Sequence, residues 1–362
     1  MSGEGPVDIL IHGQGGRVSR IAFGPLAGIG GRVDPTKTVI VTDRLIRRIH
    51  GESFPACPVI EVDRGEAAKS LVSLEALYGA FMDNSLGRDG LVLAIGGGAI
   101  SDLAGFAAST WLRGVDFGFV PTTLLAMVDA SVGGKNGVDF RGVKNLVGSF
   151  AQPLFVTMDV GLLATLPDIE FASGMAEVVK HAVLAGGAYF ELVEAEAGRI
   201  GGARRPPIDA LERIVAGSVE LKAAVVERDE RESGERRKLN LGHSVGHGVE
   251  AASGLPHGHS VAAGLGTACR LALRMGHLGA ADCGRILRLI EACALPSSIA
   301  AAARLAATVD GPDFRRAIGD AILADKKRLG PDIRMALPAA IGSVVVEAVP
   351  LADLQAFVME AP

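Results

Sequence analysis

The sequence contains few aromatic residues and few cysteines. One tryptophan, two tyrosines and the phenylalanines together make up 4% of the 362 residues. Proteins that bind single-stranded nucleic acid stack the bases on aromatic rings, so this scarcity argues against such a function. The four cysteines form no CxxC pair and have no regular spacing. This pattern argues against a disulfide scaffold and against a metal site built on thiolates.

The sequence also lacks an excess of positive charge and a long apolar run. The net charge is −5, whereas general nucleic-acid and anionic-membrane surfaces are basic. The uncharged stretch at residues 90–101 is too short and too rich in glycine to span a bilayer. The first residues, MSGEGPVDILIHG, contain no basic segment followed by an apolar one, so we expect no secretory signal. We therefore expect a cytoplasmic protein that binds neither nucleic acid nor membranes.

Short apolar runs and helical spacing alternate in the first third of the chain. The runs at residues 7–11 and 19–23 predict an antiparallel hairpin, and those at 38–41 and 91–95 predict buried strands. Residues 66–81, between them, have apolar residues near helical spacing. Strands separated by helices predict an α/β domain with a Rossmann-like, doubly wound parallel sheet.

The pattern changes near Asp168. From there on, Ala, Leu, Glu and Arg recur at helical spacing and strand-like runs are few. We expect a boundary at the turn Leu166–Pro167 and two domains, an α/β domain over residues 1–165 and a C-terminal helical domain over residues 166–362.

A glycine turn follows the predicted strand in LVLAIGGGAISD. Backbone N–H groups at such a turn can approach a pyrophosphate, and the dipole of the following helix favours its negative charge. Ser101 stands where the third glycine of GxGxxG would be, and purely structural turns share this composition. Asp43, at the end of an earlier strand, suits either a ribose hydroxyl or a helix N-cap.

Residues 121–145 form a second polar cluster around two glycine turns. Lys and Asn side chains in glycine-rich loops can bind phosphate or polyhydroxyl groups. A merely solvated loop is the alternative, but the many apolar residues of this stretch favour a functional one. The candidates are Asp129, Lys135, Lys144 and Asn145, with Arg113 upstream.

Three segments carry candidate metal ligands. Glu177, Lys180 and His181 lie at i, i+3 and i+4, on one face of a predicted helix. His243 and His247 are likewise four residues apart, and His257 and His259 stand in LPHGHS, where we expect a loop. One carboxylate and two imidazoles with open positions suit a catalytic zinc, although a single histidine is more often structural. The spacing does not identify which histidines would bind.

Several basic residues flank apolar segments of the helical half. Each alone is typical of a solvated face, but together with Lys135, Lys180 and Arg113 they would suit a phosphorylated, acidic small molecule. They are Lys222, the run Arg236, Arg237 and Lys238, and the pair Lys326 and Lys327.

The combined motifs resemble the 3-dehydroquinate synthases, a family of sugar phosphate cyclases that share a fold with iron-dependent alcohol and glycerol dehydrogenases. The resemblance covers roughly residues 43–337 and is highly specific because the motifs occur in the family's order. They are GGGAISDLAGFAASTWLRG, VPTTLLAMVDASVGGKNGVD, KNLVGSF followed by QP, TLP, GMAEVVKH and LNLGHSVGHGVE.

The resemblance implies an NAD-binding first domain and a metal- and substrate-binding second domain. It implies a zinc site, with Co²⁺ as an alternative, formed by Glu177, His243 and His257. The positions implied for NAD are Asp43, Glu66, Lys69, Gly97, Gly98, Asp102, Thr122, Thr123, Lys144 and Thr165. Those implied for the substrate are Asp129, Lys135, Asn145, Lys180, Lys222, Arg236, Asn240, His247, one of Lys326 and Lys327, and Arg113, which the family donates across a homodimer interface.

The implied activity converts 3-deoxy-D-arabino-heptulosonate 7-phosphate to 3-dehydroquinate and phosphate, in the shikimate pathway. The steps are transient oxidation by NAD, phosphate elimination, reduction and intramolecular aldol closure, so the enzyme is a lyase that does not consume NAD. One departure concerns the metal site, because the family has Glu where this chain has His259. His259 would either contact a metal ligand without binding the metal itself or compete with His257 as the ligand.

Three alternatives remain open at this point. A sister cyclase would act on an amino analogue, sedoheptulose 7-phosphate or glucose 6-phosphate. A metal-dependent alcohol dehydrogenase would accumulate NADH, and a regulator that retained the fold would bind NAD without turnover. Arg236, His247 and the DKK at residues 325–327 favour the 3-dehydroquinate synthase.

Overall fold

A computed structural model describes residues 8–13, 16–200, 205–323, 328–329 and 331–361. The chain forms two compact units. The first consists of Met1–Leu166 with Lys222–Arg231, and the second of Pro167–Leu221 with Glu232–Pro362. The long helix α6 (Ile208–Arg228) therefore contributes residues to both units. Lys326 and Lys327 lie outside the described residues.

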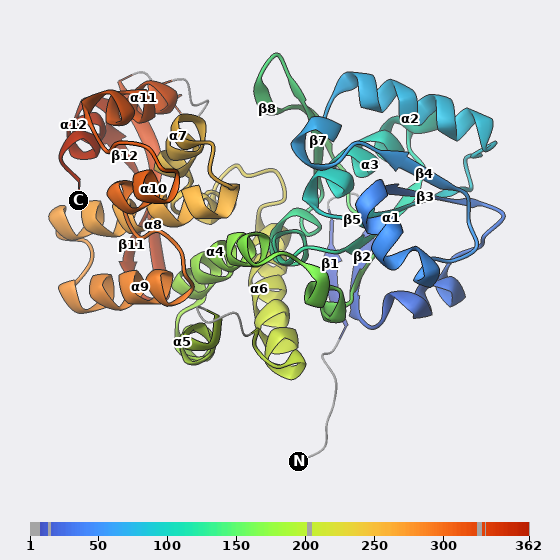
Figure 1. Cartoon of the computed structure of the whole chain (residues 1–362), viewed down its shortest axis with the longest axis horizontal. Coiled ribbons are helices and arrows are strands. Elements are labelled where there is room, and N and C mark those ends of the chain that lie inside the picture. The colour runs from blue at the N-terminus through green and yellow to red at the C-terminus, as the bar shows by residue number, and fades with distance from the viewer. Residues whose placement is uncertain (1–7, 14–15, 201–204, 324–327, 330, 362) are drawn as a thin grey trace. The chain divides into compact units, whose positions relative to one another are not determined.

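The first unit is built on a seven-stranded sheet (Figure 1). All neighbouring strands are parallel except the β1–β2 hairpin at one edge, as the sequence predicts. In spatial order the strands are β1 (Ile9–His12), β2 (Val18–Phe23), β9 (Phe155–Met158), β6 (Asp116–Pro121), β5 (Leu91–Gly96), β3 (Thr38–Asp43) and β4 (Val59–Val62).

Helices and one further hairpin complete the first unit. The central strands are continuous apolar runs because helices cover the sheet, and Ile40, Leu93 and Val120 are fully buried. The helices are α1 (Arg44–His50), α2 (Leu71–Asp83) and α3 (Gly98–Thr110), and the hairpin consists of β7 (Lys135–Phe140) and β8 (Val143–Phe150). Shorter 3₁₀ segments are Leu26–Arg32, Gly51–Ser53, Gly65–Ala68, Trp111–Arg113 and Val160–Thr165, and Ala126–Ala130 is a π-helix.

The second unit is mainly helical, as its sequence pattern predicts. Its helices are α4 (Asp168–Ala185), α5 (Gly187–Ile200), the first part of α6, α7 (His243–Ser253), α8 (His257–Arg274), α9 (Ala280–Ala292), α10 (Ile299–Leu305), α11 (Pro312–Leu323) and α12 (Leu351–Glu360), with a 3₁₀ segment at Glu235–Asn240. Among the described helices of the chain, none is both long and apolar enough to cross a membrane.

The second unit also contains a small antiparallel sheet that the sequence analysis did not anticipate. Its strands are β10 (Arg328–Leu329), β11 (Asp332–Ala340) and β12 (Ser343–Pro350). Ala340 pairs with Ser343 across a two-residue turn that ends at Gly342, whose φ of +93° suits glycine. The sheet packs against helices (Figure 1), so helical spacing dominates the sequence around it.

Candidate active site

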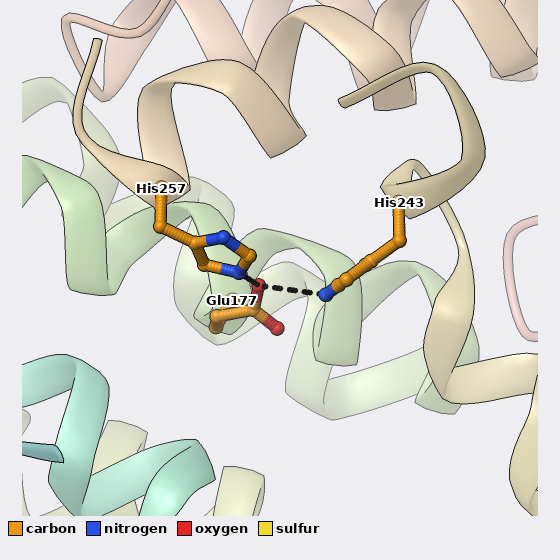
Figure 2. Close-up of side chains that lie close together, drawn as sticks. All are labelled: Glu177, His243 and His257. Atoms are coloured by element: carbon orange, nitrogen blue, oxygen red, sulfur yellow. Dashed lines mark ion pairs between the residues drawn. The ribbon is translucent and has the colours of Figure 1, made fainter. Parts of the chain in front are cut away.

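Glu177, His243 and His257 converge within the second unit (Figure 2). Oε1 of Glu177 lies 3.7 Å from Nε2 of His243 and 3.7 Å from Nε2 of His257. One donor atom from each residue lies within 4.8 Å of the other two, close enough for all three to bind one ion at bond lengths of about 2.0–2.2 Å. The family resemblance of the motifs implies these three ligands, and the fold brings them together.

The Glu177 carboxylate has the environment of a metal ligand. Both of its oxygens are buried, and within the described residues Oε1 has no hydrogen-bond donor. The Lys180 ammonium forms an ion pair with it from the next turn of α4. Burying a carboxylate without hydrogen bonds is costly unless cations compensate its charge. The donor set of one carboxylate and two imidazoles therefore fits a divalent metal.

Close backbone packing holds the three ligands at these distances. His257 is the first residue of α8, not part of a loop as the sequence suggested. A Cβ on the next residue, Gly258, would lie 1.9 Å from the carbonyl oxygen of Ser173, one turn before Glu177 in α4. A Cβ on Gly264 would lie 2.1 Å from the carbonyl oxygen of Gly242, just before α7. Only glycine permits these approaches, which lock α8 against α4 and α7.

His259 occupies a different position from His257. Its side chain is buried, and its Nδ1 has no hydrogen-bond partner among the described residues. Burial lowers the pKa of its imidazole. Because residues two apart on a helix point in different directions, His257 joins Glu177 and His243 while His259 does not.

Lys180, Arg236 and His247 are substrate candidates of the second unit, and His181 is a further candidate metal ligand. Lys180 and His181 are buried on α4, and Arg236 is buried in the 3₁₀ segment before α7. The His247 ring is exposed, with its centroid 5.4 Å from that of His243 and 6.1 Å from that of His257. Of these residues, Lys180 is paired with Glu177 and His247 lies beside His243 and His257.

Asn240 has a partner that the sequence analysis missed. Its Nδ2 donates a hydrogen bond to Oε1 of Glu232. Glu232 has a φ of +59°, a left-handed conformation that is uncommon outside glycine. Strained residues of this kind persist where the surrounding structure holds them, commonly at functional sites. No spacing rule links residues 232 and 240, so sequence periodicity could not reveal this pair.

In the first unit, Asp129 and Lys222 form a close pair. Nζ of Lys222 donates to Oδ1 of Asp129 and, at 2.6 Å, to its backbone carbonyl oxygen. Lys135 is exposed at the start of β7. Asn145 lies in β8, where its φ is +50° and its N–H donates to Oδ1 of Asp139 at 2.8 Å. Lys135 pairs with Phe150 at the open end of the β7–β8 hairpin, whereas Asn145 lies near its turn.

The proposed NAD residues cluster at the carboxyl ends of adjacent parallel strands. Gly97 and Gly98 follow β5, Thr122 and Thr123 follow β6, and Asp43 ends β3, and these three strands are neighbours in the sheet. Gly97 is the N-cap of α3, and a Cβ there would lie 3.2 Å from Cγ2 of Thr123. A strand end beside a helix N-terminus with little side-chain bulk fits the pyrophosphate of a dinucleotide.

Asp43 has a structural role in this arrangement. Its Oδ1 accepts hydrogen bonds from the N–H groups of Leu45 at 2.8 Å and Ile46 at 3.0 Å. The helix-cap interpretation of the sequence is therefore confirmed, while ribose binding remains a prediction. Lys144 is exposed on β8, and Thr165 Oγ1 lies 3.0 Å from Nε2 of His50.

Lys69 and Asp102 form a buried ion pair beside the glycine turn. Nζ of Lys69 lies 2.8 Å from Oδ2 of Asp102 and 3.5 Å from Oε1 of Glu66. Burial raises the pKa of Asp102 to about 6, more than the neighbouring Lys69 lowers it. Burial alone would lower the pKa of Lys69, but Asp102 and Glu66 together raise it. Lys69 and Asp102 are thus held together by this ion pair, and Glu66 lies at a longer distance from the same ammonium.

Arg113 lies in a strained loop of the first unit. Leu112, Arg113 and Gly114 have consecutive φ values of +49°, +70° and +113°. The preceding Trp111 anchors the loop, because its ring stacks on Tyr78 and its Nε1 donates to the carbonyl oxygen of Leu86 at 3.0 Å. Leu112 and Arg113 are exposed as a result. Two strained non-glycine residues in sequence indicate a functional loop.

Glu250 is a second residue that the sequence analysis missed. Its Oε2 lies 3.0 Å from Nδ1 of His257, on the side of the ring away from Glu177. Glu250 and His257 are seven residues apart but lie in different helices, α7 and α8, so helical periodicity does not predict their contact. Its only sequence signal is a carboxylate shortly before a candidate ligand.

Known proteins resemble this chain along most of its length. The N-terminal and C-terminal models of 3-dehydroquinate synthase match residues 59–173 and 174–327. The 3-dehydroquinate synthase of Pelobacter propionicus is 39% identical over 351 residues, which cover 95% of this chain and 93% of that protein. The enzyme of the same name from Desulforamulus reducens is 40% identical over 320 residues, or 85% of each chain.

Solved structures show the same fold. The 2-epi-5-epi-valiolone synthase of Streptomyces hygroscopicus subsp. jinggangensis, with NAD⁺ and Zn²⁺ bound, has a TM-score of 0.80 and 28% identity over 94% of this chain and 95% of that one. A probable glycerol dehydrogenase from Sinorhizobium meliloti has a TM-score of 0.67 and 14% identity over 94% and 95%, which shows the fold alone. The resemblance seen in the motifs is thus confirmed, and the chain belongs to the 3-dehydroquinate synthase family.

Proposed function

We propose that this protein converts 3-deoxy-D-arabino-heptulosonate 7-phosphate to 3-dehydroquinate and inorganic phosphate. The observation that carries the proposal is the convergence of Glu177, His243 and His257, with Lys180 paired to the carboxylate, in a chain of this family. The relatives that bear the name 3-dehydroquinate synthase match across both units. The proposal therefore rests on the whole chain and not on a single motif.

The chain offers a site for each group that this reaction requires. We assign Glu177, His243 and His257 to a divalent metal, zinc or cobalt(II), and the carboxyl ends of β3, β5 and β6 to NAD. When bound, NAD supplies a hydride acceptor that is regenerated, and the metal supplies a Lewis acid. A related synthase with NAD⁺ and Zn²⁺ bound supports both assignments.

The NAD contacts of this proposal all lie in the first unit. Gly97 and Gly98 would admit the pyrophosphate to the N-terminus of α3, where the helix dipole favours negative charge. Asp43 and Glu66 would accept hydrogen bonds from ribose hydroxyls, as acidic groups do at such strand ends. Lys69 and Asp102 would hold one another in place, and Thr122, Thr123, Lys144 and Thr165 complete the proposed contacts.

The cationic residues would bind the phosphate of the substrate and orient its departure. Lys135 and Lys222 of the first unit and Lys180 and Arg236 of the second carry the charge, and Asp129 holds Lys222 through its carboxylate. Charge-assisted hydrogen bonds of this kind stabilise phosphate as it leaves and restrict the substrate to a reactive geometry. Asn145, Asn240 and His247 would contact the hydroxyl and carboxylate groups, and one of Lys326 and Lys327, outside the described residues, is proposed beside them.

We also propose that the protein acts as a homodimer and that Arg113 of one subunit contacts the substrate phosphate of the other. The exposed and strained loop at residues 112–114, anchored by Trp111, supports this assignment. Backbone strain of this kind clusters at functional sites, and delivery of an arginine to a neighbouring subunit is one such function. The expected cytoplasmic location belongs to the same proposal.

Release of inorganic phosphate tests the proposed reaction. The metal-loaded protein with a catalytic amount of NAD is offered heptulosonate 7-phosphate, sedoheptulose 7-phosphate and glucose 6-phosphate in parallel. We expect phosphate from the first substrate alone, without accumulation of NADH. A His243→Ala variant should be inactive, and a His277→Ala variant, which changes a histidine paired with Glu347, should retain activity.

Other outcomes would contradict the proposal in distinct ways. Phosphate release from sedoheptulose 7-phosphate or glucose 6-phosphate would make the chain a sister cyclase. Stoichiometric formation of NADH would indicate an alcohol dehydrogenase. Binding of NAD without any turnover would leave the fold correct and the activity wrong.

A further inference from the structure

His257 contacts two carboxylates with its two ring nitrogens. Its Nε2 faces Oε1 of Glu177 at 3.7 Å, and its Nδ1 lies 3.0 Å from Oε2 of Glu250. The Glu250 and His257 side chains are 15% and 30% exposed, so water screens this contact only in part. The ring therefore lies between the proposed metal position and a second carboxylate.

The turn between α7 and α8 creates this contact. Glu250 stands in the last turn of α7, and His257 begins α8. Gly254 ends α7 with a φ of +68°, and the Ser253 hydroxyl accepts from the N–H of Leu255 at 3.2 Å. A left-handed C-cap followed by Leu255 and Pro256 reverses the chain direction within three residues. Glu250 and His257 are thus brought together by a turn that local hydrogen bonds define.

An acceptor at Nδ1 determines which nitrogen of an imidazole can bind a metal. Neutral imidazole carries one proton, and an acceptor beside Nδ1 keeps that proton there. The lone pair of Nε2 then points toward the metal, and the carboxylate makes the ring a stronger ligand. His243 has a weaker version of this support, because its Nδ1 lies 3.3 Å from the backbone carbonyl oxygen of Leu241.

We propose that Glu250 is a positioning residue for the metal site. Its carboxylate holds His257 in the tautomer and ring orientation in which Nε2 binds the metal. The proposal rests on the metal site proposed above. It adds a residue that neither binds the metal nor touches the substrate, and that sets how tightly His257 binds.

Metal affinity of the purified protein measures this role directly. The apo forms of the wild type and of Glu250→Gln compete for Zn²⁺ with a chromogenic chelator. We expect the variant to bind Zn²⁺ about 10- to 100-fold more weakly, the range typical of lost outer-sphere partners. Glu250→Asp keeps the charge on a shorter side chain, so its affinity should fall between those of the wild type and Glu250→Gln.

Glu347→Gln is the matched control. Glu347 pairs with His277 at 2.9 Å, so the variant removes the same kind of carboxylate–histidine contact in the same unit, but from a histidine outside the metal cluster. Its Zn²⁺ affinity should equal that of the wild type. Melting temperatures of the apo proteins report folding separately, and we expect Glu250→Gln to match the wild type within a few degrees.

Each contrary result has a definite meaning. Equal Zn²⁺ affinities for the wild type and a folded Glu250→Gln variant would overturn the positioning role while leaving the metal site intact. Failure of the wild type to bind Zn²⁺ would overturn the proposed metal site as well. If Glu250→Gln does not fold, the Glu250→Asp affinity decides, and a value equal to that of the wild type would contradict the proposal.

Discussion

Some candidate residues of the two units are held in opposite ways. In the second unit Glu177, Lys180 and Arg236 are at most 3% exposed and lie on helices or a 3₁₀ turn. In the first unit Lys135 and Arg113 are exposed, on a hairpin and a strained loop. Side chains held by packing are preorganised for catalysis, whereas side chains on loops need the ligand to order them. Substitutions of these buried residues should therefore affect stability together with function, and those of the exposed residues mainly ligand binding.

The largest effect is expected for Glu177→Ala. This variant removes the only carboxylate of the proposed metal cluster and one partner of the buried Lys180. We expect loss of stoichiometric Zn²⁺ binding and a decrease in kcat of about 10³-fold, since a Lewis acid supplies several kcal/mol. The stability of the apo protein should fall by about 3 kcal/mol because a buried ion pair is broken. Metal analysis, phosphate release and denaturant unfolding would measure the three changes, and full metal occupancy would contradict the assignment.

The variants Gly258→Ala and Gly266→Ala compare the effect of disturbed packing beside the metal site with the effect of disturbed packing elsewhere. In each variant the new Cβ would meet a backbone oxygen at 1.9 Å, that of Ser173 for Gly258 and that of Ser297 for Gly266. Both should lower the melting temperature, because overpacking costs about 1–3 kcal/mol. Only Gly258→Ala should weaken Zn²⁺ binding, since it displaces the start of α8 and His257 from Glu177. Equal affinities in the two variants would show that this close approach does not position the ligand.

Arg113→Ala tests the opposite behaviour in the first unit. The side chain is exposed, so we expect an unchanged melting temperature and a decrease in kcat/KM of about 100-fold through loss of a phosphate contact. If Arg113 acts on the neighbouring subunit, mixing Arg113→Ala with Glu177→Ala after subunit exchange should restore about a quarter of wild-type activity, since half of the dimers are mixed and each has one intact site. Subunit exchange without restored activity would place Arg113 in its own subunit's site.

The smallest effect concerns Asp102 and pH. Its pKa is raised to about 6 in the folded protein by burial, so between about pH 4 and 6 the folded state binds a proton that the unfolded state has released. The contribution of Asp102 to the free energy of unfolding of the wild type therefore falls as pH rises through that window, and it is constant above it. The asparagine of the Asp102→Asn variant does not titrate. Relative to the wild type, the free energy of unfolding of this variant should therefore rise by about 2 kcal/mol between pH 4 and pH 6. Denaturant unfolding at several pH values would measure the shift, and a constant difference would contradict the raised pKa.

Part of the site could be predicted from sequence because its signals are local. A strand, a glycine turn and a helix follow one another at residues 91–110, and helical geometry alone places Glu177, Lys180 and His181 on neighbouring positions of α4. The motif resemblance then connected these local signals with a family. The choice between His257 and His259 was beyond such signals, because it depends on the direction in which each side chain leaves α8.

The sequence by itself determined the parallel sheet, the helical second half, the family and the residue types available for metal, NAD and phosphate. Periodicity and turn chemistry act between residues a few positions apart, and both are readable along the chain. Only the tertiary structure decided that Glu177 meets His243 and His257, that Lys222 joins Asp129, and that Glu250 supports His257. These contacts depend on how closely glycines such as Gly258 let the helix backbones approach, and that distance is a property of packing and not of local sequence.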